Sequence, residues 1–293
     1  MRKAFAAAVL SQWNDEDCFF LTGDLGFMAL EEIQSAFGRR FVNVGVAEQN
    51  MVGVAAGLAR ESLRVIAYSI APFCYARPFE QIRNDLCLGN LPVCLVGNGG
   101  GYAYGHMGPT HHALEDCAAM SALGVRVLVP AFDDDLPAML GKLEGPTYLR
   151  LGYDARPAGQ IVPEYAPWRE ILPGNCGAIA ALGPLAGVAW QALADLDVDS
   201  RPAVWAVCEL NAEIPSKCLD QIAGRPLYVL EEHVAQGGLG MNLALNLTAQ
   251  GLTAGRFVHR PALGYPTGRF GSQAFHRAQC GLDAPSIRAL VTG

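Results

Sequence analysis

Short apolar segments of strand length recur along the whole chain and alternate with stretches of helical pattern. Six of them precede residue 152 and four follow residue 174. This alternation predicts parallel sheets with helices on both faces, because parallel neighbouring strands need a long crossover connection. The predicted strands are 18–21, 41–44, 64–68, 93–96, 125–129 and 147–149 in the first series, and 177–182, 203–208, 227–230 and 256–259 in the second.

A proline-rich stretch separates the two series. It carries Pro157, Pro163, Pro167 and Pro173, and prolines interrupt both helices and strands. A length of 293 residues is typical of about two domains. We therefore predict the α/β class, with two consecutive α/β domains at 1–152 and 175–293. Each should hold a mostly parallel sheet flanked by helices, and 153–174 should be a linker.

Composition narrows the function classes. The chain is 51% hydrophobic and 17% charged, which suits a globular protein with two cores. Its net charge of −7 argues against nucleic acid as the main partner. It has no membrane-length apolar run and no signal-like N-terminus, and its nine cysteines form no C-x-x-C pair. These features predict a cytoplasmic protein with reduced, buried thiols and no membrane partner.

Residues 39–59 hold the most informative local pattern. An apolar strand-like run gives way to a helix rich in small residues, and Glu48 lies at the junction. The helix dipole favours a carboxylate in the first turn, and the apolar surroundings should desolvate it. Gly53 and Gly57 keep the helix thin, so another backbone can come close. A glutamate here is commonly only a dipole partner on a wet surface. The alternative is an active site at a subunit interface.

This segment resembles the signature of the pyrimidine-binding domain in the transketolase family of thiamine diphosphate enzymes. Four other stretches are similar to family segments and occur in the family order: 22–25, 69–84, 105–116 and 146–150. The resemblance implies that Glu48 hydrogen-bonds N1′ of the cofactor's aminopyrimidine and helps to activate C2. In such enzymes the cofactor supplies the difficult chemistry, and the protein supplies orientation and proton control.

The resemblance also implies roles for further residues. Glu48 and His111 are the candidate catalytic residues, with His111 facing the reacting carbon. Arg77 suits either an interface or the substrate, Arg150 either a phosphate clamp or an ion pair, and His112 either substrate or a backbone anchor. The candidate cofactor-binding residues are Glu48, Phe73, Arg77 and Phe79, and the candidate substrate residues are Asp24, His106, Met107, His112 and Arg150.

Three polar contacts of ordinary sugar-phosphate transketolases are missing. Met107 stands where the family usually has an aspartate that bonds a donor hydroxyl. Met28 and Gly99 stand in place of a phosphate-contacting serine and histidine. A site that discriminates through hydrogen bonds changes its substrate when it loses them. The pattern predicts a less polar or differently shaped substrate than the usual donors.

The diphosphate half of the family site is also missing. Family members bind Mg²⁺ and the diphosphate with a Gly-Asp-Gly motif followed at a fixed spacing by an asparagine, and this sequence lacks that motif. The resemblance therefore implies the C-terminal subunit of a split enzyme, with an N-terminal diphosphate-binding transketolase subunit as partner, in an α2β2 heterotetramer. The cofactors would be thiamine diphosphate and Mg²⁺, with the Mg²⁺ ligands on the partner.

The predicted reaction is transfer of a two-carbon ketol unit from a ketose-like donor to an aldehyde acceptor, both small sugar or keto molecules. Two alternatives remain open. One is a decarboxylating acyl ligation from a 2-oxo acid, as in deoxyxylulose phosphate synthase. The other is a non-catalytic subunit that stabilises an active partner. The presence of Glu48 and His111 argues against this second alternative.

Overall fold

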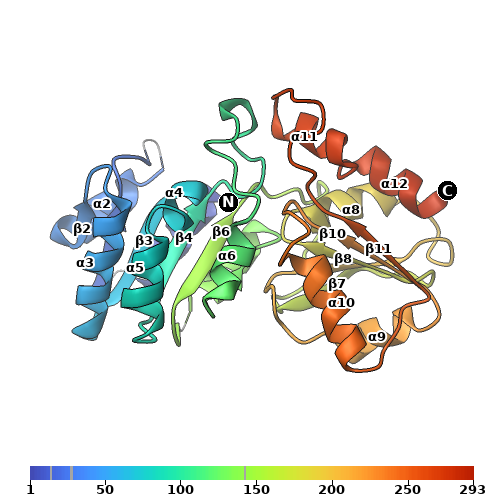
Figure 1. Cartoon of the computed structure of the whole chain (residues 1–293), viewed down its shortest axis with the longest axis horizontal. Helices are drawn as coiled ribbons and strands as arrows, with labels where there is room; N and C mark the ends of the chain where they lie inside the picture. The colour runs from blue at the N-terminus through green and yellow to red at the C-terminus, as the bar shows by residue number, and fades with distance from the viewer. Residues whose placement is uncertain (14, 27–28, 142) are drawn as a thin grey trace.

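The computed structural model describes residues 1–13, 15–26, 29–141 and 143–293. Two sheets stand beside each other, one in the blue-to-green half of the chain and one in the yellow-to-red half (Figure 1). Each sheet is built from one continuous part of the sequence and is flanked by helices. This confirms the predicted fold class.

The first sheet is wholly parallel, in the order β2-β1-β3-β4-β6-β5. Its inner strand β4 is buried along its full length, as the near-continuous apolar run predicts for a strand covered on both faces. The carboxyl ends of parallel strands lie at one edge, and that edge carries the candidate site. The strands are β1 (Cys18–Thr22), β2 (Phe41–Asn43), β3 (Arg64–Ile70), β4 (Val93–Asn98), β5 (Arg126–Leu128) and β6 (Thr147–Leu151).

Helices cover both faces of this sheet. Phe5 and Val9 of α1 (Arg2–Gln12) belong to one hydrophobic cluster, whereas Met51 and Val52 of α3 (Glu48–Arg60) belong to the other. The remaining helical segments are α2 (Glu31–Phe37), η1 (Gly38–Arg40), α4 (Ala71–Tyr75), α5 (Phe79–Gln81), the π-helical η2 (Ile82–Cys87), η3 (Gly105–Met107), α6 (Asp116–Ala122), η4 (Asp133–Asp135) and α7 (Leu136–Met139).

The second sheet has the order β11-β10-β8-β9-β7. Its strands are β7 (Trp168–Leu172), β8 (Ala178–Leu182), β9 (Ala203–Val207), β10 (Pro226–Leu230) and β11 (Arg256–Arg260). Its helices are α8 (Leu185–Leu193), α9 (Ser216–Ile222), α10 (Leu239–Ala249), α11 (Gln273–Cys280) and α12 (Ala284–Thr292).

The edge strand β7 corrects the predicted linker. It lies inside 153–174 and pairs antiparallel with β9, while the other pairs of this sheet are parallel. The charged residue Arg169 breaks its apolar pattern in the sequence. In the fold Arg169 is buried and forms an ion pair with Asp135, so the strand is stable despite that charge.

All nine cysteines are free thiols, and Cys176 is the exposed one. Among the described residues, no helix has both the length and the apolar composition that crossing a bilayer requires.

Candidate active site

Glu48 opens helix α3 at the edge of the first sheet. The chain reaches it from β2 through Gly45, whose φ of +73° is a conformation that glycine adopts without strain. The Gly45 amide donates a hydrogen bond of 2.9 Å to the Asn43 side chain, which fixes this turn. The Glu48 side chain is only 4% exposed. The predicted desolvated carboxylate at a helix start is confirmed, and the helix dipole favours its charge.

Arg77 is the ionic partner of this carboxylate. Its Nη1 lies 2.9 Å from Oε2 and 3.0 Å from Oε1 of Glu48, and the Ser69 hydroxyl lies 3.5 Å from Oε1. The Arg77 guanidinium also lies over the Phe73 ring, 3.9 Å from its centroid. The ion pair compensates the burial of Glu48. An open groove borders the pair, lined also by Val46, Ala47, Gln49 and Asn50.

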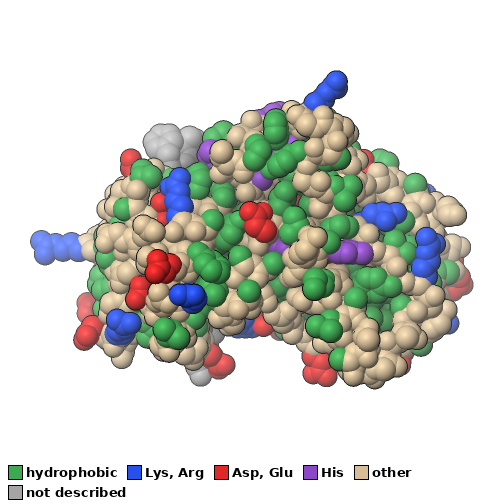
Figure 2. All heavy atoms as spheres, in the orientation of Figure 1, with side chains coloured by type: hydrophobic (Ala, Val, Ile, Leu, Met, Phe, Trp, Pro, Cys, Tyr) green, Lys and Arg blue, Asp and Glu red, His purple; other side chains and the backbone are tan. Residues whose placement is uncertain are grey.

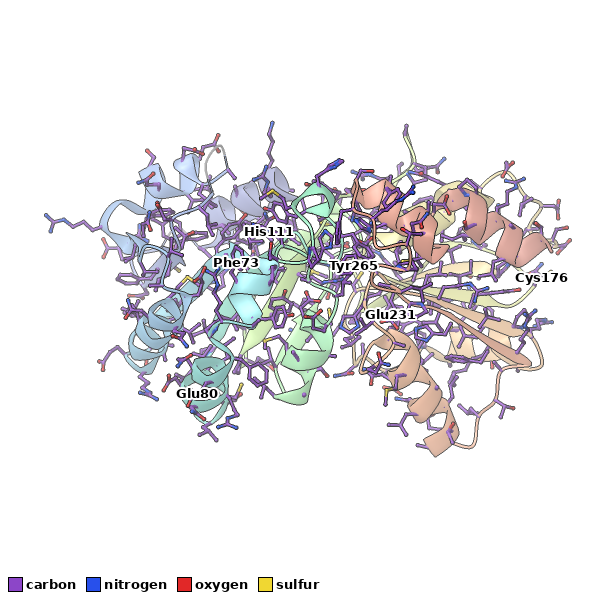
Figure 3. All side chains as sticks on the ribbon, turned by 45° about the horizontal axis from the view of Figure 1, so that its top comes forward. Phe73, Glu80, His111, Cys176, Glu231 and Tyr265 are labelled. Carbon is purple, nitrogen blue, oxygen red and sulfur yellow. The ribbon has the colours of Figure 1, made fainter. Side chains whose placement is uncertain are left out.

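His111 joins the same group from the loop that follows η3. Its ring meets the Phe73 ring edge-on, with 5.2 Å between centroids, and lies 6.2 Å from the Tyr104 ring. Figure 3 shows Phe73 and His111 close together above the first sheet. One continuous series of contacts therefore joins Glu48, Arg77, Phe73 and His111, which come from three segments far apart in the sequence. These four residues are called the Glu48 group.

His112 points away from this group. Its ring is buried, with Nδ1 2.8 Å from the Tyr265 hydroxyl and Nε2 3.1 Å from the Gly105 carbonyl oxygen. Burial lowers the pKa of His112 below its usual value. Because both ring nitrogens are occupied, this geometry fits the backbone-anchor alternative better than the predicted substrate contact.

Arg150 lies on β6 and links the two halves of the chain. Its Nε donates to Asp116 at 2.8 Å, and its Nη2 donates to the carbonyl oxygens of Ala113 and Glu232 at 2.7 and 2.9 Å. The side chain is buried. This geometry supports the ion-pair alternative over the predicted phosphate clamp, because the three contacts hold the buried guanidinium against Asp116 and two backbone carbonyl oxygens.

Arg150→Leu should therefore lower the free energy of unfolding of the isolated chain by about 3–5 kcal/mol, because it leaves the buried Asp116 carboxylate unpaired. Urea unfolding measures this change. Arg288→Leu is the matched control, since Arg288 pairs with Asp195 at the exposed surface and should change stability little. Equal losses in the two variants would contradict the structural role of Arg150.

The remaining predicted residues have other surroundings. Phe79 packs against the hydrophobic core, which does not fit a cofactor contact. Asp24 is exposed, accepts a 3.3 Å hydrogen bond from Asn43 and lines a separate pocket. His106 and Met107 are exposed on η3. Met28 lies outside the described residues.

Gly99 has a structural reason for lacking a side chain. Its φ is +78°, and a Cβ at this position would overlap the Tyr104 ring. Tyr104 thus fills the space beside Gly99, and its hydroxyl accepts a 2.7 Å hydrogen bond from the Asn98 amide.

Sequence reasoning missed a pocket with two basic residues beside Tyr104, whose ring faces His111. Arg2 and Lys3 line it together with Asn98, Gly99 and Tyr104, and its one acidic lining residue, Asp133, is paired with the Met1 ammonium. No local motif marks the two basic residues, because the fold alone brings the start of α1 to the carboxyl end of β4. Two cationic side chains next to the His111 loop could hold an anionic group.

The comparisons with known proteins agree with one another on the family. The family model described as "Transketolase, pyrimidine binding domain" matches residues 1–152. The chain is 30% identical over 253 residues to an apulose-4-phosphate transketolase subunit of Phocaeicola vulgatus, covering 82% of this chain and 80% of that protein. It is 33% identical over 270 residues to 1-deoxy-D-xylulose-5-phosphate synthase 1 of Geobacter sulfurreducens, covering 86% of this chain and 41% of that protein.

One solved structure is similar over nearly the full length of both chains. It is described as a split gene transketolase, an inactive beta4 tetramer. The TM-score is 0.81 and the sequence identity 28%, and the match covers 99% of this chain and 96% of the other.

Proposed function

Because this chain belongs to the transketolase family, we propose that it is the C-terminal subunit of a split, thiamine-diphosphate-dependent transferase. The observation that carries the proposal is the buried Glu48 carboxylate beside an open groove, in contact through Arg77 and Phe73 with His111. The match to a separate transketolase subunit, over four fifths of both chains, supports a split enzyme. We place an N-terminal diphosphate-binding subunit opposite this groove, in an α2β2 assembly.

The residues around the groove fit the aminopyrimidine half of thiamine diphosphate. Glu48 supplies a buried carboxylate, which suits a ring nitrogen that carries a proton, and Phe73 supplies a half-buried aromatic face. In the part of the chain that the structure describes, the one clustered set of potential metal ligands is the buried group Asp116, Cys117 and His233. That set does not suit Mg²⁺, which prefers oxygen ligands and phosphate. We therefore assign the Mg²⁺ and diphosphate ligands to the partner.

Each residue has a task in this proposal. Bound thiamine diphosphate supplies the electron sink for breaking a bond next to the donor's carbonyl group. Glu48 holds the proton at N1′ of the aminopyrimidine, and Arg77 must leave the carboxylate for this to happen. Phe73 orients the ring. His111 moves a proton at a substrate oxygen, and Arg2 and Lys3 bind an anionic end of the substrate.

The proposed reaction is transfer of a two-carbon ketol unit from a ketose-like donor to an aldehyde acceptor. The second candidate is decarboxylating acyl ligation from a 2-oxo acid, which the 33% identity to a deoxyxylulose phosphate synthase supports. The two differ in what is consumed. Incubating the reconstituted complex with pyruvate, and separately with ketoses, and following substrate loss decides between them.

Xylulose 5-phosphate should be a poor donor for the complex. Met107 offers no hydrogen bond from its exposed position on η3, and Tyr104 fills the space at Gly99. Each lost hydrogen bond should lower kcat/KM on the order of tenfold. Steady-state kinetics measures this, and Met107→Asp should recover part of the loss. Efficient use of xylulose 5-phosphate by the parent would contradict the argument from these substitutions.

We also place the protein in the cytoplasm. Its nine free thiols, most of them buried, support a reducing compartment. Fractionation of the source cells tests this location.

A further inference from the structure

The loop 105–112, which carries His111, is held by residues of the second half of the chain. Tyr265 follows β11, and helix α11 starts a few residues later. Figure 3 shows His111 and Tyr265 near the boundary between the two halves, and Figure 2 shows histidine side chains gathered in the upper middle of the molecule. The remaining residues of the Glu48 group all come from the first half. This loop is where the second half reaches the candidate active site.

The hydrogen bonds of His112 fix its tautomer. The Gly105 carbonyl oxygen can only accept a hydrogen bond, so Nε2 of His112 carries the ring proton. Nδ1 is then an acceptor, and the Tyr265 hydroxyl donates to it at 2.8 Å. The two rings also stack, with 5.6 Å between centroids and 27° between planes. A neutral His112 thus connects the start of the loop to the second half.

A second contact holds the same loop at Gly105. His276 on α11 lies beside this loop: its ring is 5.1 Å from the His112 ring, and its Nε2 accepts a hydrogen bond of 3.3 Å from the Gly271 amide. A Cβ on Gly105 would overlap the Gly271 carbonyl oxygen, so the loop backbone packs directly against the residues that lead into α11. The Tyr102 ring stacks on His276 at 4.6 Å and 10°.

Both histidines sit in an environment that keeps them uncharged. Burial is the main cause that lowers the pKa of His112 and that of His276. A neutral ring can accept and donate at the same time, which the two hydrogen bonds of His112 require. The titratable groups that influence the pair and its tyrosine partners are His106, Glu115, Glu232 and Cys280, and Glu232 is itself paired with Arg277.

We propose that His112 and Tyr265 are positioning residues, which fix the loop 105–112 on the second half and thereby place His111 beside Phe73. His111 is one residue from His112, so a shift of the His112 ring moves the His111 backbone directly. The catalytic consequence rests on the proposed function, whereas the effect on the loop does not. The C-terminal half thus contributes to the reaction without supplying a group that touches the substrate.

Amide hydrogen exchange in the full chain tests the effect on the loop. The amides of Gly108 and His111 form hydrogen bonds within this segment, the Met107 amide bonds the Tyr104 carbonyl oxygen just before it, and all three report its opening. Tyr265→Phe removes only the hydroxyl, and exchange of these amides should become about tenfold faster, the effect of losing one partly buried hydrogen bond. Tyr153→Phe is the matched control, because Tyr153 is 55% exposed, and it should leave the loop unchanged.

Two substitutions of His112 separate its hydrogen bonds from its packing. His112→Leu removes donor and acceptor, and loop exchange should again rise about tenfold. His112→Gln keeps one donor and one acceptor, and exchange should return to within about threefold of the parent. In the complex reconstituted with the partner, Tyr265→Phe and His112→Leu should lower kcat about tenfold and leave the KM for thiamine diphosphate unchanged, and His112→Gln should restore kcat.

The effect on the loop and the effect on turnover can be contradicted separately. Loop exchange within twofold of the parent in both Tyr265→Phe and His112→Leu would overturn the positioning role. Faster exchange with an unchanged kcat would show that the placement of His111 does not matter for turnover. That result would count against His111 in the proposed function.

Discussion

Glu48→Gln should slow hydrogen–deuterium exchange at C2 of bound thiamine diphosphate by about 10²–10⁴-fold in the assembled complex, the usual contribution of a general acid–base group. The amide is nearly isosteric with the carboxylate, so packing around the start of α3 should survive. Glutamine has no negative charge to hold a proton at N1′ of the aminopyrimidine. The effect should therefore fall on cofactor activation and not on assembly.

Exchange at C2, followed by NMR after acid quench, reports this step without knowledge of the substrate. Glu80→Gln is the matched control. Glu80 is exposed on α5 and lies well away from Phe73 and His111 in Figure 3. In the Glu80→Gln complex, C2 of the bound cofactor should exchange at the parent rate. A rate for Glu48→Gln within a few-fold of the parent would mean that another group activates the cofactor.

The Glu48→Gln variant should be about as stable as the parent, so a slower exchange at C2 would not reflect unfolding. Arg77 loses its ionic partner in Glu48→Gln, but its side chain is 44% exposed and keeps its position over the Phe73 ring. Exposed arginines tolerate the loss of a partner at a cost of at most about 1 kcal/mol. Partner binding and urea unfolding of the variant should accordingly stay close to the parent values.

The fold was largely predictable because its signals are local. Inner parallel strands such as β4 and β8 are covered on both faces and read as near-continuous apolar runs. Strand β7 was missed because it lies at an edge, runs antiparallel and contains Arg169. Only the fold shows that Asp135, more than thirty residues earlier, satisfies that charge.

The residues of the candidate site also differ in how far the sequence alone predicts their roles. Glu48 was predictable because the helix start, the apolar flanks and the family pattern all lie within a few residues of it. His112 and Arg150 were not, because their partners Tyr265 and Glu232 come from the second half of the chain. A side chain whose role depends on a contact across two domains leaves no signal in its own neighbourhood.

The isolated chain should show no turnover with thiamine diphosphate, Mg²⁺ and any candidate donor. Among the described residues there is one cluster of potential metal ligands, Asp116, Cys117 and His233. It does not suit Mg²⁺ and a diphosphate, because it is buried and holds a single carboxylate. In the free chain Arg77 also occupies both oxygens of Glu48 and covers the Phe73 ring. The cofactor would have to displace this contact without the binding energy of its diphosphate.

Adding the diphosphate-binding partner to the same assay should produce turnover that saturates at a fixed ratio of the two chains. The control is the Glu48→Gln chain, which should bind the partner as tightly as the parent and still give no turnover. This comparison separates assembly from chemistry, since both samples form the complex and only one has the carboxylate. Turnover by the purified chain without a partner, lost on Glu48→Gln, would overturn the split-enzyme proposal, because the chain would then hold the whole cofactor by itself.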